Sequence, residues 1–373
     1  MPLAVLISIR FSGGGDVYGQ FTETRILWPF SQTELHYVPF RLGQGRAIFR
    51  VKATGSGFRF YGELAHELYI GNLYAYSVIL EGLSASDPGF LDLDALSGSG
   101  RSVQRDYLRR ASLEYQSRYL GLAIGRRVLN WSTTFFWTPL NIFTPQNNLS
   151  VVPDDVPFSD CAFIALRPPG PVSLEFAYSP PSARDSSDAW RAGARALCYL
   201  PGFDLVFEAG YNRGDTLAGV GLSANLIGGT LRAEACFYRS AEPRYVLGYD
   251  RMLPGSVYIL AEYYRNGRAD PSGQGLYSFY EKDYAGILVS RAYDMVWNFA
   301  FYGVVCASDG SFMLVPLIKR AFGRGFEARI GAYYFYGKDT EISSDSSGFP
   351  VINRGDYFGD LGPGVFAGLS YGF

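Results

Sequence analysis

The side chains of this sequence that could do chemistry are mostly Arg and Glu, placed at matching distances from short turns. If the chain folds back at residues 56–57, Arg50 lies opposite Glu63 and Arg46 lies opposite Glu67 on one face of a hairpin. The neighbouring positions, which belong to the other face, are mostly apolar. Charged side chains in this arrangement can line an aqueous passage and act on a solute through its charge.

A second hairpin repeats the pattern. A two-residue turn at 201–202 places Arg195 opposite Glu208 on the polar face and Ala196 opposite Phe207 on the apolar face. Each charged pair again falls on one side only. The same rule therefore predicts a sheet with one apolar face and one charged face.

A turn at 117–118 extends the rule to a third hairpin. It pairs Leu113 with Leu122 and Ala111 with Ile124 on the apolar face. A small soluble barrel would fill its interior with apolar side chains, so charges on the inner face predict a wide interior that is wet.

Strands must position these residues, and the sequence supplies segments of about ten residues that alternate apolar and polar. This is the length that a tilted strand needs to cross a membrane. Counts of sixteen or twenty remain open because residues 73–83 could form a further strand. The eighteen predicted strands are 16–28, 44–54, 58–70, 107–117, 119–129, 160–167, 171–179, 189–199, 203–212, 216–226, 230–239, 244–252, 256–265, 283–292, 295–306, 311–321, 325–337 and 364–373.

The connections between these strands are sorted by length. All those after even-numbered strands have two or three residues, whereas every long connection follows an odd-numbered strand. Short turns at one end and long loops at the other are typical of outer-membrane barrels, with the turns in the periplasm and the loops outside. The sequence therefore predicts an all-β, transmembrane, antiparallel up-and-down β-barrel. The long connections are 29–43, 71–106, 130–159, 180–188, 266–282 and 338–363.

The predicted lumen carries both signs of charge in nearly equal number. An anion-selective pore would need an excess of Arg or Lys at its narrowest point, and no such excess is visible. The predicted lumen-lining residues are Arg46, Arg50, Glu63, Glu67, Arg110, Glu114, Arg127, Arg191, Arg195, Glu208, Arg232, Glu234, Glu262, Glu327 and Arg329.

The connection 130–159 is the best candidate for a constriction. It is too apolar to lie loose in water, so we expect it to fold against the barrel wall or into the lumen. A loop that only caps the barrel is an equal alternative. The run 126–131 with Pro139 and Pro145 resembles a segment of large porin-like outer-membrane proteins. The aromatic residues of the predicted constriction are Trp131, Phe135, Phe136, Trp137 and Phe143.

The last ten residues alternate strictly and end on an aromatic residue. The spacing of Gly368, Tyr371 and Phe373 resembles the terminal signal by which bacterial outer-membrane β-barrels are recognised by their assembly machinery. This resemblance implies a barrel in the outer membrane of a Gram-negative-type envelope. The barrel-assembly machinery and the membrane lipid are then expected partners.

Composition argues against several other classes. A net charge of −2 with mixed signs excludes a nucleic-acid footprint. Only His36 and His66 are present, in no catalytic arrangement, and no phosphate loop or nucleophile motif occurs, so we predict no enzyme and no cofactor. The four cysteines show no metal-like spacing, so we predict no metal site.

The domain prediction is a single barrel over 16–373, preceded by a remnant of an export segment over 1–15 or by a true start upstream. We expect a porin-like channel for passive diffusion of small hydrophilic solutes, with a homotrimer as an open alternative. A surface adhesin or receptor that binds through loops 71–106 and 338–363 remains open. So does a substrate-specific transporter of sugars or fatty acids.

Overall fold

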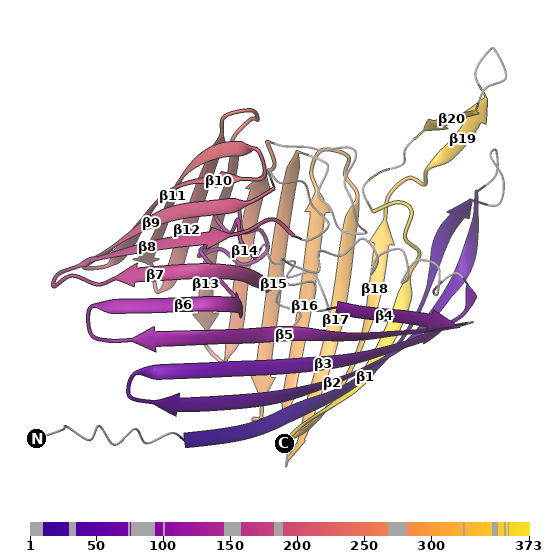
Figure 1. Ribbon diagram of the computed structural model, residues 1–373. Helices are drawn as coiled ribbons and strands as arrows, with labels where there is room; N and C mark the ends of the chain where they lie inside the picture. The colour runs from indigo at the N-terminus through magenta and orange to yellow at the C-terminus, as the bar shows by residue number, and fades with distance from the viewer. Residues whose placement is uncertain are drawn as a thin grey trace, which may run out of the picture.

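The chain forms one closed barrel, seen in a computed structural model (Figure 1). Each strand pairs antiparallel with its neighbours along the chain, and the last strand pairs with the first, which closes the ring. The structure describes residues 10–29, 35–73, 75, 94–99, 101–144, 158–182, 189–267, 282–323, 325–344, 350–353, 356 and 358–373.

Eighteen of the described strands make up the ring, which confirms the predicted fold and strand number. They are β1 (Arg10–Pro29), β2 (Leu35–Gly55), β3 (Phe58–Gly71), β5 (Ser102–Gln116), β6 (Leu120–Arg127), β7 (Ser159–Leu166), β8 (Val172–Ser179), β9 (Arg191–Leu200), β10 (Phe203–Asn212), β11 (Asp215–Leu226), β12 (Gly229–Tyr238), β13 (Arg244–Leu253), β14 (Val257–Arg265), β15 (Asp283–Tyr293), β16 (Trp297–Cys306), β17 (Phe312–Gly323), β18 (Phe326–Tyr336) and β21 (Gly364–Gly372).

Three short strands lie outside the ring. β4 (Asp94–Ser99) pairs with the first half of β5, beyond the end of β6. β19 (Glu341–Ser344) and β20 (Pro350–Asn353) form a hairpin that projects away from the barrel (Figure 1). Most of the further strand considered at 73–83 lies outside the described residues.

The ends of the barrel differ as predicted, with one exception. Short turns join β2 to β3, β9 to β10 and each later pair on that side, and β21 ends there (Figure 1). The prediction of a loop over 29–43 is wrong. β1 and β2 pair from Arg10↔Thr54 up to Pro29↔Leu35, so most of that segment is a long hairpin.

Hairpin register was predicted correctly where the turn has two residues. Arg46↔Glu67 and Arg50↔Glu63 pair across β2 and β3. The pairing predicted for β5 and β6 is wrong by two residues, since Leu113 lies opposite Ile124. The cause is a longer turn, closed by a hydrogen bond from the Ser117 N–H to the Leu120 carbonyl at 2.8 Å.

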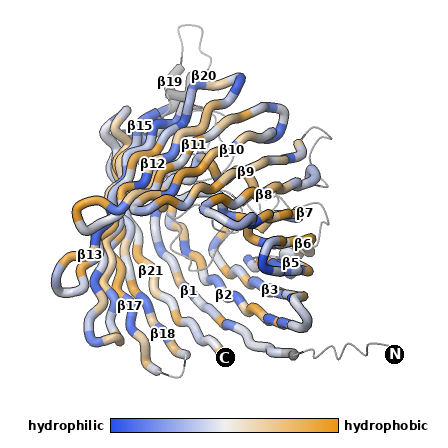
Figure 2. The backbone as a smooth tube through the Cα atoms, turned by 90° about the vertical axis from the view of Figure 1, so that its left-hand side faces the viewer, coloured by the Kyte–Doolittle hydropathy of each residue, from blue (hydrophilic) through white to orange (hydrophobic). Residues whose placement is uncertain are grey.

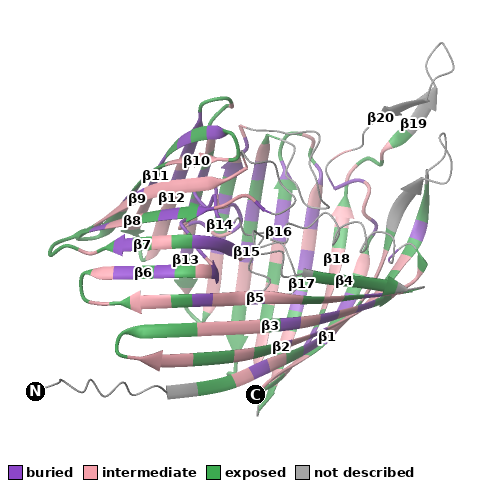
Figure 3. Cartoon of the chain, in the orientation of Figure 1, coloured by how far each residue is buried: buried purple, intermediate pink, exposed green. Residues whose placement is uncertain are grey.

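The two faces of the barrel wall differ in what they expose. Hydrophobic and hydrophilic residues alternate along the strands (Figure 2). Buried, intermediate and exposed positions are interspersed along the wall (Figure 3), and buried and exposed positions alternate strictly over the first seven residues of β11. Large apolar side chains such as Phe49, Phe207 and Ile330 point outward and are half exposed. A continuous apolar outer face is what a barrel presents to lipid. No helix among the described residues is long and apolar enough to cross a membrane.

Candidate functional site

Residues 128–144, which follow β6, lie inside the barrel and are here called the inserted loop. Trp131, Phe136, Trp137 and Phe143 are all almost completely buried. The contacts and hydrogen bonds of the inserted loop as a whole reach β9, β10, β11, β12, β14 and β15. Only a segment on the concave side of the ring can touch so many strands, so the inserted loop packs against the inner wall.

One half of the inserted loop packs over β13 to β17. The Trp137 ring stacks on the Tyr264 ring with centroids 5.4 Å apart and lies 6.1 Å from the Tyr284 ring. The same cluster includes buried aliphatic residues of the inner wall, among them Leu260 and Val304. This part of the wall is therefore dry and packed like a protein core.

The other half of the inserted loop packs over β7 to β12. Trp131 meets Phe143 edge to face at 4.9 Å, and Leu140 and Ile142 join them in a buried cluster. Arg191 on β9 donates a hydrogen bond to the Phe143 carbonyl at 3.1 Å. A hydrogen bond from the wall thus accompanies the apolar contact of this half of the loop.

Glu234 on β12 anchors the start of the inserted loop. Its carboxylate accepts hydrogen bonds from the Ser132 hydroxyl at 2.9 Å, from the Thr133 hydroxyl at 2.9 Å and from the Thr133 N–H. The residue is 2% exposed. Charge-assisted bonds of this kind are stronger than neutral ones, so they fix the loop backbone to the wall.

Glu262 on β14 is a second anchor of the same type. Its two oxygens accept the N–H groups of Phe135 and Phe136, each at 2.6 Å. A backbone N–H that is buried against the wall is out of reach of water and must find an acceptor in the protein. Two wall carboxylates supply them.

Glycines on the inner wall make room for the loop side chains. A Cβ at Gly193 would lie 2.6 Å from the Trp131 ring, and one at Gly286 would lie 2.8 Å from the Phe136 ring. A Cβ at Gly219 would collide with Leu140. These positions admit no side chain while the inserted loop is seated.

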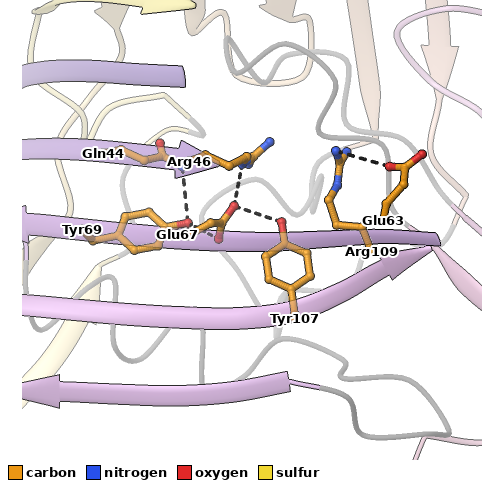
Figure 4. Close-up of polar contacts among 7 residues, drawn as sticks. All are labelled: Gln44, Arg46, Glu63, Glu67, Tyr69, Tyr107 and Arg109. Atoms are coloured by element: carbon orange, nitrogen blue, oxygen red, sulfur yellow. Dashed lines mark hydrogen bonds and ion pairs between the residues drawn. The ribbon is translucent and has the colours of Figure 1, made fainter. Parts of the chain in front are cut away.

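The wall formed by β2, β3 and β5 is polar instead (Figure 4). Arg46 Nε lies 2.6 Å from Glu67 Oε1, and both side chains are nearly fully buried. The hydroxyls of Tyr69 and Tyr107 donate to Glu67 at 2.8 and 3.0 Å. The Arg46 and Glu67 charges are thus compensated within a network that spans three strands.

More ion pairs continue this polar wall toward the turns. Arg50 pairs with Asp16 and lies 3.9 Å from Glu63, which also lies 3.8 Å from Arg109. Arg110 bonds to Glu114 at 2.9 Å. Arg109 is an extra residue at a break in the β3–β5 register, which brings two successive arginines close to the polar wall.

The other residues predicted to line the lumen lie elsewhere on the wall. Arg195 is 3.7 Å from Glu175, whereas neither oxygen of buried Glu208 has a hydrogen-bond partner among the described residues. Arg232 pairs with Asp250. The remaining three positions are Arg127, stacked on Phe163 at 4.9 Å; Arg329, which bonds to Gln20 at 2.8 Å; and Glu327, opposite Ser370.

The expectation of a wet interior throughout is wrong for one half of the ring. On β13 to β17 the inner positions are mostly apolar, and the inserted loop covers them. The sequence misled because inner and outer residues on these strands are both hydrophobic.

A buried ion pair next to the inserted loop was not predicted from the sequence. Arg126 forms two hydrogen bonds of 2.8 Å to Asp160, and both side chains are 7% exposed. Arg126 breaks the alternation of its strand, and that break was the available signal. The strand bends at Gly125, whose φ of 111° a residue with a side chain rarely adopts.

The residues of the predicted assembly signal lie at the seam of the ring. Tyr371 stacks on Phe326 at 4.4 Å, and Phe373 exchanges two backbone hydrogen bonds of 2.9 Å with Gly15. Gly368 faces Gln20 on β1 and Arg329 on β18 in register. Recognition by other proteins stays a prediction.

A closed antiparallel barrel of eighteen strands is the fold of the large porin-like outer-membrane β-barrels. Three solved structures are similar over almost the whole chain. OccK7 (OpdD) of Pseudomonas aeruginosa has a TM-score of 0.56 at 12% identity, with 97% of this chain and 98% of that one covered.

OccD3 (OpdP) of the same organism has a TM-score of 0.55 at 9% identity, with coverage of 97% and 91%. OccAB3 of Acinetobacter baumannii has a TM-score of 0.55 at 9% identity, with coverage of 97% and 99%. At these identities the likeness establishes the fold. No protein-family model and no curated protein matches the sequence.

Proposed function

We propose that this chain is an outer-membrane channel through which small hydrophilic solutes diffuse passively, narrowed by the inserted loop. An eighteen-stranded ring is too wide for wall side chains alone to fill, so its centre is open to water unless a segment plugs it. The solutes would pass between the inserted loop and those charged side chains of β2, β3 and β5 that keep exposed area, such as Arg50 at 36% and Arg110 at 25%.

The position of the loop anchors carries this proposal. Glu234 on β12 and Glu262 on β14 hold the inserted loop to the wall. In the order of the ring, β12 lies halfway round from β2, and β14 lies halfway round from β5. The inserted loop is thus fixed to the side of the barrel that faces the charged network around Arg46 and Glu67.

The fold comparison supports the same class of function. OccK7, OccD3 and OccAB3 are outer-membrane porins, and porins act without catalysing a reaction. We propose accordingly that the chain acts as a channel rather than as an enzyme. The barrel domain, expected from residue 16, would begin with β1 at Arg10 and would be assembled by the barrel-assembly machinery, with the homotrimer as an alternative to a monomer.

The direct test is the conductance of the refolded protein in a planar lipid bilayer. We expect discrete ohmic steps, and a reversal potential in a salt gradient that reports the balance of the wall charges. Swelling of vesicles that hold the protein, in sugars of increasing size, then gives the exclusion limit.

A folded barrel that gives no current and no swelling would contradict the channel. Heat-modifiable migration and strand content by circular dichroism establish that the protein is folded. In that case a surface receptor that works through its loops is the better account.

A further inference from the structure

Three arginines form a belt on the outer face of the barrel, near the short turns. Arg251, Arg291 and Arg320 stand near the ends of β13, β15 and β17, and all three are exposed. They alternate in phase with Leu247, Ile287 and Ile318, which belong to the apolar outer face. Every second strand contributes one arginine, and the register offsets each arginine by two residues from the next, so neighbours on the belt are about 12 Å apart along the wall.

The belt is continuous across the intervening strands. Arg291 lies opposite Val257 on β14 and opposite Phe299 on β16, and Arg320 lies opposite Trp297. The Arg320 guanidinium stacks on the rings of Trp297 and Phe322 at 4.8 and 4.9 Å. Arg291 and Arg320 therefore sit among apolar or aromatic side chains.

The described part of the chain does not compensate the charges of this belt. Among the described residues, no hydrogen bond or ion pair engages the guanidinium of Arg251, Arg291 or Arg320. The nearby Asp250 faces inward, where its carboxylate accepts hydrogen bonds from Arg232 and from the Tyr258 hydroxyl. Asp294, in the turn after β15, is the exposed acid closest along the chain.

We infer that this belt binds the phosphates of anionic phospholipids in the leaflet that faces the turns. The inference rests on the proposed membrane barrel. An arginine on a lipid-facing wall can lay its stem along apolar surface and extend its guanidinium to the headgroups. Aromatic residues beside it are typical of the membrane interface. A periplasmic protein would meet the turn tips rather than the wall, so lipid is the occupant that fits this belt.

Native mass spectrometry of the full chain, released from mixed phosphatidylglycerol and phosphatidylcholine bilayers, tests this inference. We expect the wild type to retain phosphatidylglycerol over phosphatidylcholine by about threefold or more, because each guanidinium near the surface adds attraction for anionic lipid. The triple variant Arg251→Gln, Arg291→Gln, Arg320→Gln should lose the preference, and the triple Lys variant should keep most of it.

The matched control is Arg41→Gln, which removes an exposed arginine at the opposite end of the barrel and should leave the lipid preference unchanged. Inorganic phosphate at 10 mM should not displace the retained phosphatidylglycerol, because the site binds the phosphate of a lipid held in a membrane. Raising sodium chloride should weaken the preference of the wild type, and this arm needs no variant.

Equal retention of the two lipids by the wild type would overturn the inference, as would a preference that survives in the triple Gln variant. Loss of the preference on Arg41→Gln would also overturn it. Single-channel conductance should be the same in the wild type and the triple Gln variant, because the belt lies outside the lumen. A folded barrel that gives no current but keeps the lipid preference would contradict the proposed channel and would still support lipid binding by the belt.

Discussion

The two halves of the inner wall solve the problem of a wide barrel in different ways. The half formed by β2, β3 and β5 keeps its charges and compensates them in pairs, as Arg46 and Glu67 show. The region formed by β9 to β17 carries glycines and apolar residues beside a few buried charges such as Glu234 and Glu262, and the inserted loop covers it. The loop is therefore seated where the wall is apolar, and the polar wall of β2, β3 and β5 lies across the ring from the two loop anchors.

This difference also separates the roles of the buried carboxylates. Glu67 compensates an arginine on its own wall, whereas Glu234 and Glu262 accept N–H groups from the inserted loop. The same residue type thus holds a wall together on one side and holds a loop in place on the other. Substitutions on the polar side should lower the stability of the wall, whereas those on the other side should loosen the inserted loop.

The largest effect is expected from Trp137→Ala on the apolar half. The variant removes a 3% exposed ring from between the loop and the wall, at a cost of about 3–5 kcal/mol. We expect a lower midpoint of urea unfolding in lipid vesicles and faster cleavage of the loop by a protease. Phe207→Ala, on the outer face of the same half, is the control and should leave the loop protected. Equal loop cleavage in both variants would contradict the claim that Trp137 packs the inserted loop against the inner wall.

On the polar half, Glu67→Gln should cost about 3 kcal/mol, because it leaves the buried Arg46 charge without a partner. The tyrosine hydroxyls can still bond to the amide. The double variant Arg46→Met, Glu67→Leu should recover most of the loss, as measured by urea unfolding. If the double variant is no more stable than Glu67→Gln, charge compensation is not what holds this wall.

Glu262→Gln should weaken the anchor without removing the aromatic packing. The amide offers one acceptor where the carboxylate took two N–H groups, so the loop should lose about 2 kcal/mol of attachment. Added noise in the single-channel current is the measurement. Glu208→Gln is the matched control, because Glu208 is equally buried on a nearby strand and accepts no bond from the described part of the loop. Equal current noise in both variants would contradict the claim that Glu262 holds the inserted loop to the wall.

The smallest effect is expected from Arg41→Ala. This residue pairs with Glu23 at 2.9 Å, but the two side chains are 61% and 44% exposed. An exposed pair contributes less than about 1 kcal/mol. The midpoint of urea unfolding should hardly change. A loss of stability as large as that of Glu67→Gln would show that burial does not determine how much an ion pair contributes to the free energy of unfolding.

Much of the fold could be predicted because each strand carries its own signal. Alternation gave all eighteen ring strands, and two-residue turns gave the register of Arg195↔Glu208. The β5–β6 register failed because the turn at Ser117 is longer than its sequence suggests. The β1–β2 hairpin was cut short because Leu35 to Leu42 alternate poorly.

The site was predictable only in part. The aromatic composition of the loop indicated that it folds inward, but its seat depends on contacts between residues far apart in the chain, such as Trp131 with Gly193. Nor could hydropathy separate the inner Val304 from the outer Val305, since both are valines on adjacent positions. Which half of the wall is dry became visible only from three-dimensional packing.

The most direct test of the account is the single-channel conductance of a variant in which residues 132–143 are replaced by a short Gly-Ser linker, compared with the wild type. The account predicts a folded barrel with larger ohmic steps, because the inserted loop occupies part of the cross-section. Steps of unchanged size from a folded variant would contradict the claim that the inserted loop narrows the channel.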